Sequence, residues 1–308
     1  MTDRKVKNKV ASVRQRLQNL SRKTGEDFQL LLTRYAVERF LYRLSRSPHA
    51  NRFLLKGAML FALWTGRMHR PTRDLDLLGF GESSDSSLLS VFRELCQAID
   101  EDDALGFRSE SVSVEPIREE QEYGGQRVRI DVRLGNARID LQVDVGFGDA
   151  ITPAPQLVKY PTLIGMPAPE LRAYPPETVV AEKLQALVQL GMANSRMKDF
   201  FDLWIMGRTF PFNGETLRSA IAATFSRRIT EMPLTVPMGL TATFSTDDTK
   251  NKQWSAFCMR GGLKAHASQL KEVVKMLEGF LFPPLLAAAR GEPFAYQWAP
   301  SGPWSPTK

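Results

Sequence analysis

Two aspartates separated by a single residue constrain this chain more than any other feature. They lie in the segment Arg73-Asp74-Leu75-Asp76-Leu77. On a β-strand, residues two apart point to the same face, so the two carboxylates would project side by side while the leucines enter the core. Close carboxylates repel one another unless a cation lies between them, and hard oxygen ligands of this kind suit Mg²⁺. The pattern predicts a metal site on a strand. For an isolated pair, the alternative is a polar edge strand facing water.

The residues before this pair predict a strand, a turn and a helix. Arg52 to Lys56 has the pattern of a short buried strand, and Ala58 to Trp64 has the apolar density of a buried helix. Gly57 turns the chain between them. Backbone N–H groups at such a turn can bind phosphate oxygens.

The residues after the pair predict an antiparallel hairpin. Two alternating runs, Arg127 to Arg133 and Ala137 to Phe147, surround a Leu134-Gly135-Asn136 turn. The second run carries Asp140 and Asp144 on one face, and either could supply a third carboxylate. A strand, a glycine turn, a helix, an acidic strand and a later acidic strand form the layout of a two-metal phosphoryl-transfer site, with ions about 4 Å apart.

Apolar periodicity and turn residues predict the remaining elements. The run Arg73 to Phe80 is a predicted strand, and 106–116 is another. Helices are predicted over 6–20 (ending near Gly25), 27–44, 88–99, 177–190, 195–206, 215–226 and 268–281. Prolines from Pro153 to Pro176 predict a connecting stretch, and the tail after Pro283 is predicted to be irregular. The fold is therefore expected to be α/β, with a mixed sheet followed by a mainly helical lobe.

Composition excludes several classes of protein. No run of 18 apolar residues occurs, and no apolar segment follows the charged N-terminus, so we expect neither a membrane span nor a secretory signal. Cys96 and Cys258 are far apart and are expected to be buried small hydrophobes. The histidines at 49, 69 and 266 have no metal-site spacing, and serine-hydrolase and P-loop signatures are absent. The chain is expected to be cytoplasmic.

The charge balance favours a polyanionic partner. The formal net charge is +7 and the isoelectric point is about 9.5. The basic first helix could contact nucleic acid or could be an ordinary solvated face. The same two interpretations apply to Arg67, Arg70 and Arg73 beside the aspartate pair, which could steer a triphosphate or an RNA.

Several segments together resemble one family, the AbiEii/AbiGii (MenT-like) toxin nucleotidyltransferases of the polymerase-β-type nucleotidyltransferase superfamily. The matching segments are FLLKGAMLFALWTG, HRPTRDLDLLGFG, LQVDVGFGD, YPPETVVAEKLQALVQLG and NSRMKDFFDLW. The resemblance runs from about residue 10 to 210, and it rests on the order and spacing of all five segments. It implies a polymerase-β-like core over 47–165, preceded by a helical segment over 1–46 and followed by a helical lobe with an irregular tail over 166–308.

The resemblance also implies roles for particular residues. Asp74 and Asp76 match the metal-binding pair, Asp144 is the preferred third carboxylate, and Asp140 is the fallback. The implied catalytic set adds Lys183, which would hold the triphosphate, and Asp199 of the KDFFD motif. The implied nucleotide-binding residues are Lys56, Gly57, Ala58, Arg73, Lys183 and Arg196. Many relatives have Gly or Ser where this chain has Ala58, which loses a hydroxyl contact but keeps the backbone donor.

The helix of the KDFFD motif can be interpreted in two ways from its residues alone. Arg196, Asp199 and Asp202 are spaced by three and share a broad face. Lys198 and Asp202 could instead form an ordinary surface pair at i, i+4. With the resemblance, Lys183, Arg196 and Asp199 are expected to face a nucleotide, whereas Glu182 is expected to pair with a neighbouring cation.

The function implied is that of a Mg²⁺-dependent toxin that transfers a nucleoside monophosphate from a nucleoside triphosphate to RNA, with the 3′ end of tRNA as the expected acceptor. A separate antitoxin protein would be the partner. Two other classes stay open: a nucleotidyltransferase that modifies a protein or small molecule, and a non-catalytic binding module of the same fold. The preferred nucleotide and the oligomeric state are not indicated.

Overall fold

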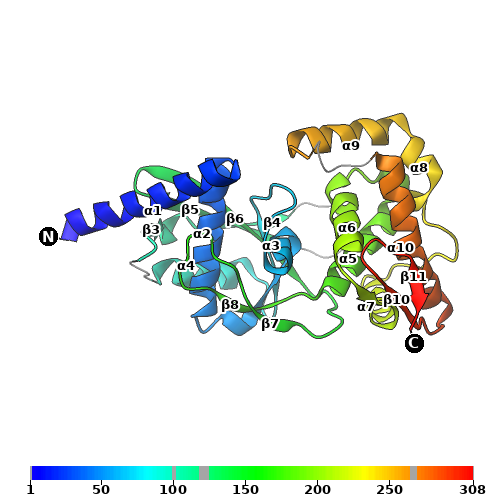
Figure 1. Ribbon diagram of the computed structural model, residues 1–308. Helices are drawn as coiled ribbons and strands as arrows, with labels where there is room; N and C mark the ends of the chain where they lie inside the picture. Colours follow the sequence, from blue (N-terminus) through cyan, green and yellow to red (C-terminus); the bar gives the residue numbers. More distant parts are fainter. Residues whose placement is uncertain (1, 99–101, 118–124, 264–268, 308) are drawn as a thin grey trace. The chain divides into compact units, whose positions relative to one another are not determined.

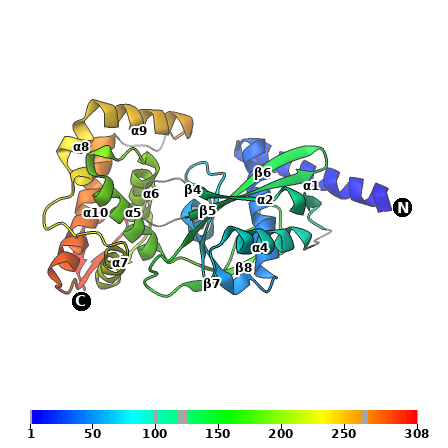
Figure 2. The same cartoon turned by 180° about the vertical axis from the view of Figure 1, so that it is seen from behind.

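The computed structural model describes residues 2–98, 102–117, 125–263 and 269–307. The chain divides into two compact units. Unit 1 comprises residues 1–148 and 156–173, and unit 2 comprises residues 149–155 and 174–308. Both units are drawn in Figures 1 and 2.

Unit 1 is built on a mixed β-sheet, which confirms the predicted α/β class. Its strands are β1 (Phe53–Lys56), β2 (Leu75–Gly79), β3 (Leu105–Phe107), β4 (Ser113–Ile117), β5 (Gly125–Leu134), β6 (Ala137–Phe147), β7 (Gln156–Lys159) and β8 (Glu170–Ala173). Within the described residues their order is β3-β5-β6-β2-β1-β8-β7, with β4 also paired to β5. The pairs β2–β6 and β1–β8 are parallel, and the other pairs are antiparallel.

Helices cover the apolar side of this sheet. They are α1 (Thr2–Thr24), α2 (Phe28–Ser45), α3 (Leu60–Thr65) and α4 (Asp85–Gln97), with the 3₁₀ turns η1 (Ala50–Arg52), η2 (Gly57–Met59) and η3 (Ser109–Ser111). Phe40 of α2 stacks on Phe92 of α4 at 5.5 Å, and Phe92 meets Phe53 of β1 edge-on at 5.9 Å. All three rings are almost fully buried. This aromatic cluster fixes the two helices on the sheet.

The β5–β6 hairpin has one apolar and one polar face, as the alternating sequence predicts. Val128, Ile130 and Val132 of β5 are at most 1% exposed, whereas the residues between them are half-buried and charged. The polar face carries the predicted carboxylates, so hydrophobic patterning alone decides which side of the sheet holds them.

Unit 2 is mainly helical, as expected. Its helices are α5 (Pro176–Leu190), α6 (Met197–Thr209), α7 (Gly214–Arg227), α8 (Ala242–Thr246), α9 (Asp248–Arg260) and α10 (Leu270–Arg290), with turns η4 (Gly191–Ala193) and η5 (Met238–Leu240). A small antiparallel sheet joins β9 (Phe212–Asn213), β10 (Tyr296–Trp298) and β11 (Trp304–Pro306).

Three sequence-based expectations need correction. The single strand predicted over 106–116 is two strands, β3 and β4, because η3 intervenes and Ser111 Oγ accepts a hydrogen bond from the Asp131 amide at 2.9 Å. The proline-rich connecting stretch contains β7 and β8. The tail is not irregular: α10 continues through Pro283 and Pro284.

Burial of apolar side chains explains why the C-terminal segment is ordered into α10 and β10. Beyond the prolines, Leu285 of α10 is fully buried, so packing outweighs the lost backbone hydrogen bonds. Further on, Trp298 Nε1 donates to the Gly207 carbonyl at 2.7 Å and holds β10 against α6. Ile99 and Ser268, the predicted ends of two helices, and His266 lie outside the described residues.

The expectation for the two cysteines is confirmed. Cys96 and Cys258 are buried free thiols, and burial raises the pKa of Cys96 to about 12. In the part of the chain that the structure describes, no helix is long and apolar enough to cross a bilayer.

We expect the buried pair of Arg43 and Asp103 to be essential for holding α2 in place. Arg43 and Asp103 are ion-paired with 4% and 0% of their side chains exposed, and the Asp103 carboxylate also accepts from the Leu105 amide at 2.8 Å. Asp103→Ala leaves a buried guanidinium uncompensated, which costs about 3–5 kcal/mol of stability in urea denaturation. The neighbouring Asp102 is 80% exposed and pairs with Lys9, so Asp102→Ala should cost less than about 1 kcal/mol. Equal unfolding midpoints for the two variants would contradict this account.

Candidate active site

One row of charged residues crosses five strands of unit 1. The strand register places Glu115 opposite Arg127, Arg127 opposite Asp144, Asp144 opposite Asp76, and Asp76 opposite Lys56. Directly paired residues on neighbouring strands point to the same face of a sheet. The row alternates in sign except at Asp144 and Asp76, where two carboxylates are neighbours on adjacent parallel strands.

Arg127 forms a bidentate ion pair with Asp144, one of these two carboxylates. Arg127 Nε lies 2.9 Å from Asp144 Oδ1, and Arg127 Nη2 lies 2.8 Å from Asp144 Oδ2. Gln142 donates a further hydrogen bond to Asp144 Oδ1 at 3.2 Å. The hydrogen bonds to Asp144 raise the pKa of Arg127, so the guanidinium keeps its charge at any physiological pH. The fork geometry fixes the orientation of Asp144.

The other carboxylate lies against the predicted glycine turn. Gly57 has a positive φ of 75°, and a Cβ atom at this position would be 1.9 Å from Asp76 Oδ2. Only glycine leaves room for the Asp76 carboxylate there. The turn and the aspartate pair, separated in the sequence, therefore belong to one site.

The first aspartate of the pair lies just outside the strand. Asp74 precedes β2 by one residue and is exposed, whereas the sequence predicts it within the strand. It is near enough to Arg127 for its charge to contribute to the raised pKa of that residue. Asp144 and Asp74 thus both act on Arg127, while Asp76 lies beside Asp144 on the neighbouring strand.

The donor set fits a divalent cation. Asp76 and Asp144 are hard oxygen donors whose repulsion a cation would relieve. Among the residues that the structure describes, no three acidic, histidine or cysteine side chains already converge on one point. At this site, Asp144 does not converge with Asp76 on one point, because both oxygens of Asp144 contact Arg127.

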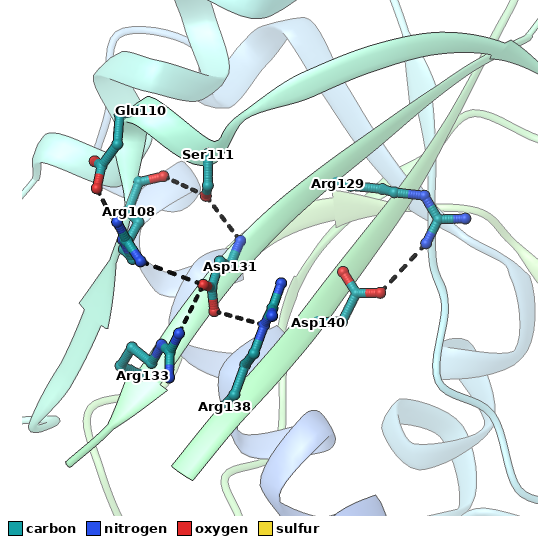
Figure 3. A network of polar contacts seen from close by, with 8 residues as sticks. All are labelled: Arg108, Glu110, Ser111, Arg129, Asp131, Arg133, Arg138 and Asp140. Carbon is teal, nitrogen blue, oxygen red and sulfur yellow. Dashed lines mark hydrogen bonds and ion pairs between the residues drawn. The ribbon is translucent and has the colours of Figure 1, made fainter. Parts of the chain in front are cut away.

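Asp140, the fallback for the third carboxylate, belongs to a different network. Its carboxylate is 63% exposed and pairs with Arg129 at 3.3 Å (Figure 3). Beside it, Asp131 is surrounded by arginines at 3.6, 3.1 and 3.4 Å, namely Arg108, Arg133 and Arg138. Strand β6 pairs with β2 only from Val143 onward, so Asp140 is not beside the aspartate pair. This placement favours Asp144.

The predicted residues of unit 2 form a second cluster. Lys183 Nζ of α5 lies 2.5 Å from Asp199 Oδ1 and 2.9 Å from Asp202 Oδ2, both on α6. Arg196 Nε contacts Asp199 Oδ2 at 2.9 Å. Burial alone would raise the pKa of Asp199, but the charges of Lys183 and Arg196 outweigh it and hold the pKa below its ordinary value. Asp199 is therefore ionised throughout the physiological range.

This cluster excludes one of the two interpretations of the KDFFD motif. Asp202 is 1% exposed and pairs with Lys183, while Lys198 is exposed, so the surface pair of Lys198 and Asp202 is not what this motif forms. Arg196 caps the start of α6 and is not within the helix. Glu182 contacts Arg228 at 3.6 Å, which confirms that it pairs with a cation.

The remaining predicted residues lie around the Gly57 turn. Lys56 ends β1 and stands in the charged row, whereas Ala58 is 4% exposed and packs into the core. Arg73 is exposed immediately before Asp74, and Arg67 is exposed in the loop after α3.

The sequence-based analysis missed Arg127 and Gln142, and it did not foresee that Asp202 contacts Lys183. A signal for Arg127 is present in the sequence. With Gly135 and Asn136 as a two-residue turn, antiparallel register places residue 127 opposite residue 144, as observed. The parallel pairing of Asp76 with Asp144 has no such local signal.

Comparison with known proteins shows the family of this chain. A family model described as the nucleotidyl transferase AbiEii toxin of type IV toxin–antitoxin systems matches residues 39–275. The chain belongs to this family and is accordingly a nucleotidyltransferase, as the sequence resemblance implies. A search of curated proteins finds no match.

Two solved structures are similar to this chain. JHP933 from Helicobacter pylori is 15% identical with a TM-score of 0.47, covering 86% of this chain and 91% of its own. An H. pylori protein named provisionally as a nucleotidyltransferase is 17% identical with a TM-score of 0.46, covering 86% and 95%.

Gly57 and Gly66 offer a matched test of the site geometry. Both have positive φ, 75° and 72°, but a Cβ at Gly66 would meet nothing within 4 Å. Gly66→Ala should therefore cost only the backbone strain, about 1–2 kcal/mol, and keep activity. Gly57→Ala adds a collision with Asp76 and should abolish nucleotidyl transfer even at temperatures where the variant stays folded by circular dichroism. Full activity of Gly57→Ala would show that Asp76 is not confined by this turn.

Proposed function

We propose that this toxin uses Mg²⁺ held by Asp74, Asp76 and Asp144 to transfer a nucleoside monophosphate from a nucleoside triphosphate to RNA, with the 3′ end of tRNA as the acceptor. The observation that carries the proposal is the break in the charged row, where Asp76 and Asp144 are direct neighbours. In a row that otherwise alternates in sign, this is the one step at which a cation improves the electrostatics.

The carboxylates would act as the ligands of the cation. Bound Mg²⁺ supplies charge neutralisation for the triphosphate and activates the acceptor hydroxyl. Asp76 is already held by the Gly57 turn and by its pairing with Lys56 across β1 and β2. Asp144 is held by Arg127, which must share or release the carboxylate when a cation is bound.

The triphosphate would be held by backbone and basic groups. We assign this role to the backbone at Gly57 and Ala58 and to the side chains of Lys56 and Arg73, which lie on or beside the charged row. The Gly57 turn is the part of the site where a peptide N–H can approach phosphate without a side chain in the way.

In unit 2, Lys183 and Arg196 would provide further positive charge for the triphosphate. Asp199 and Asp202 orient Lys183 by two short ion pairs, so its ammonium is restrained before a nucleotide binds. Asp199 also holds Arg196. These aspartates are positioning residues, because their carboxylates contact the cations and not the phosphates. The assignment to the nucleotide rests on the family motif.

The net charge of the chain supports RNA as the acceptor. A net charge of +7 favours RNA over a protein or small metabolite, because counterion release stabilises complexes with polyanions. Family membership also supports a cognate antitoxin as the partner protein. Transfer to tRNA would place the protein in the cytoplasm.

Labelled nucleotides provide the test. The purified chain, Mg²⁺ and each of four α-labelled nucleoside triphosphates are mixed with total tRNA and total protein, and the products are separated on a gel. We expect label in the tRNA band, loss of transfer with EDTA, and a decrease on the order of a thousand-fold (about 4 kcal/mol) for Asp76→Asn. Asp140→Asn, on the same face of the sheet but paired with Arg129, should keep the wild-type rate within about threefold.

The gel also separates the competing functions. Label in the protein lane alone would replace RNA with a protein acceptor. Unchanged transfer by Asp76→Asn would remove the metal role of the aspartate pair.

A further inference from the structure

The excess positive charge of this chain lies in one helix. Residues 2–24, which form α1, contain eight lysines and arginines and a single acidic residue, for a net charge of +7. The whole chain has 41 basic and 34 acidic residues, so the remainder is balanced at 33 of each. The net positive charge that would attract polyanions at long range is therefore equal to the charge of α1.

Helix α1 is firmly attached to unit 1 by its apolar side. Val13 and Leu17 are 3% and 0% exposed. The hairpin turn between β5 and β6 lies against the helix, since a Cβ at Gly135 would be 2.8 Å from Val10 Cγ1. Arg16 donates to the Ile164 carbonyl. The helix backbone continues past the rest of unit 1 toward its N-terminus in both views (Figures 1 and 2).

The other side of α1 presents cations to solvent. Arg14, Arg22 and Lys23 are exposed, and within the described residues none of them has a carboxylate within salt-bridge distance. Elsewhere on unit 1, surface arginines are commonly neutralised, as in the network around Asp131 (Figure 3). Lys9 of α1 pairs with Asp102, but the positive charges of Arg14, Arg22 and Lys23 are not neutralised by an ion pair within the described residues.

The length of β6 gives an estimate of the distance between α1 and Asp144. Gly135 touches α1, and Asp144 is nine residues further along the chain, almost all of them in extended β6. At about 3.3 Å per residue, the part of α1 around Val10 is roughly 30 Å from Asp144. A nucleoside triphosphate cannot contact both places, but a folded RNA can.

We propose that α1 is an RNA-docking element that binds phosphates in the body of a structured acceptor, whose end reacts at the carboxylates of the charged row. This inference rests on the proposed RNA acceptor. Helix α1 precedes the residues that the family model matches. Its contribution is to acceptor affinity and not to the chemistry, so it should affect KM for tRNA and leave kcat unchanged.

The test compares two triple variants with the same loss of charge. One is Arg14→Gln, Arg22→Gln and Lys23→Gln on α1. The control is Arg46→Gln, Arg93→Gln and Arg290→Gln, all exposed and outside α1. Because all six positions are exposed, both variants should keep the wild-type melting temperature, which is measured first.

Binding to labelled tRNA is then measured by fluorescence anisotropy between 50 and 200 mM salt, without nucleotide. The α1 variant should bind about tenfold or more weakly at the low-salt end, and the slope of log K against log salt should decrease by about 2, since each lost phosphate contact removes roughly 0.7–0.9. The control should match the wild type in slope. Transfer to a short oligonucleotide of the acceptor end should be equal for all three proteins.

Several results would overturn the inference. Equal weakening by both triples would mean that net charge, and not α1, governs binding. Unchanged tRNA binding by the α1 variant would exclude RNA docking at this helix. If wild-type protein transfers label to no RNA, the proposed function fails. The anisotropy comparison still decides whether α1 binds RNA.

Discussion

Repulsion between Asp76 and Asp144 is the interaction on which the site in unit 1 depends. Their proximity is imposed by the backbone register of two parallel strands, so neither side chain can move far from the other without breaking the sheet. Lys56 and Arg127 flank the pair and compensate part of its charge. Placing like charges side by side costs stability that an alternating row would not, and in the proposed function a bound cation would recover that free energy. The repulsion would then be a source of metal affinity.

In unit 2, two buried carboxylates restrain Lys183, the residue proposed to bind the triphosphate. A flexible lysine is a poor anchor for a triphosphate because ordering its side chain costs up to about 2 kcal/mol. Here Asp199 and Asp202 restrain Lys183 beforehand, and both carboxylates are nearly inaccessible to water. The pKa of Asp199 lies below its usual range, so the restraint is maintained across physiological pH. In the proposed function, the charged row of unit 1 would bind the cation, and the restrained Lys183 of unit 2 would bind the triphosphate.

Local sequence signals were sufficient for much of the fold and for part of the site. The aspartate pair, the Gly57 turn, the hairpin and the main helices each follow from residues close together in the chain. The pairing of β2 with β6 and of β1 with β8 depends on contacts between distant segments, which periodicity does not encode. The continuation of α10 through two prolines likewise depends on tertiary burial. Arg127 was predictable from the hairpin register, but its role required Asp76 to be placed on the next strand.

Divalent-cation binding tests the central claim most directly. Mn²⁺, which accepts the same oxygen ligands as Mg²⁺, can be titrated into the protein and followed by electron paramagnetic resonance in the presence of a non-hydrolysable nucleoside triphosphate. The account predicts saturable binding by the wild type and by Asp140→Asn, and binding at least tenfold weaker for Asp144→Asn. Wild-type Mn²⁺ affinity in Asp144→Asn would contradict it, because the adjacent carboxylates of the charged row would then not be the site of the cation.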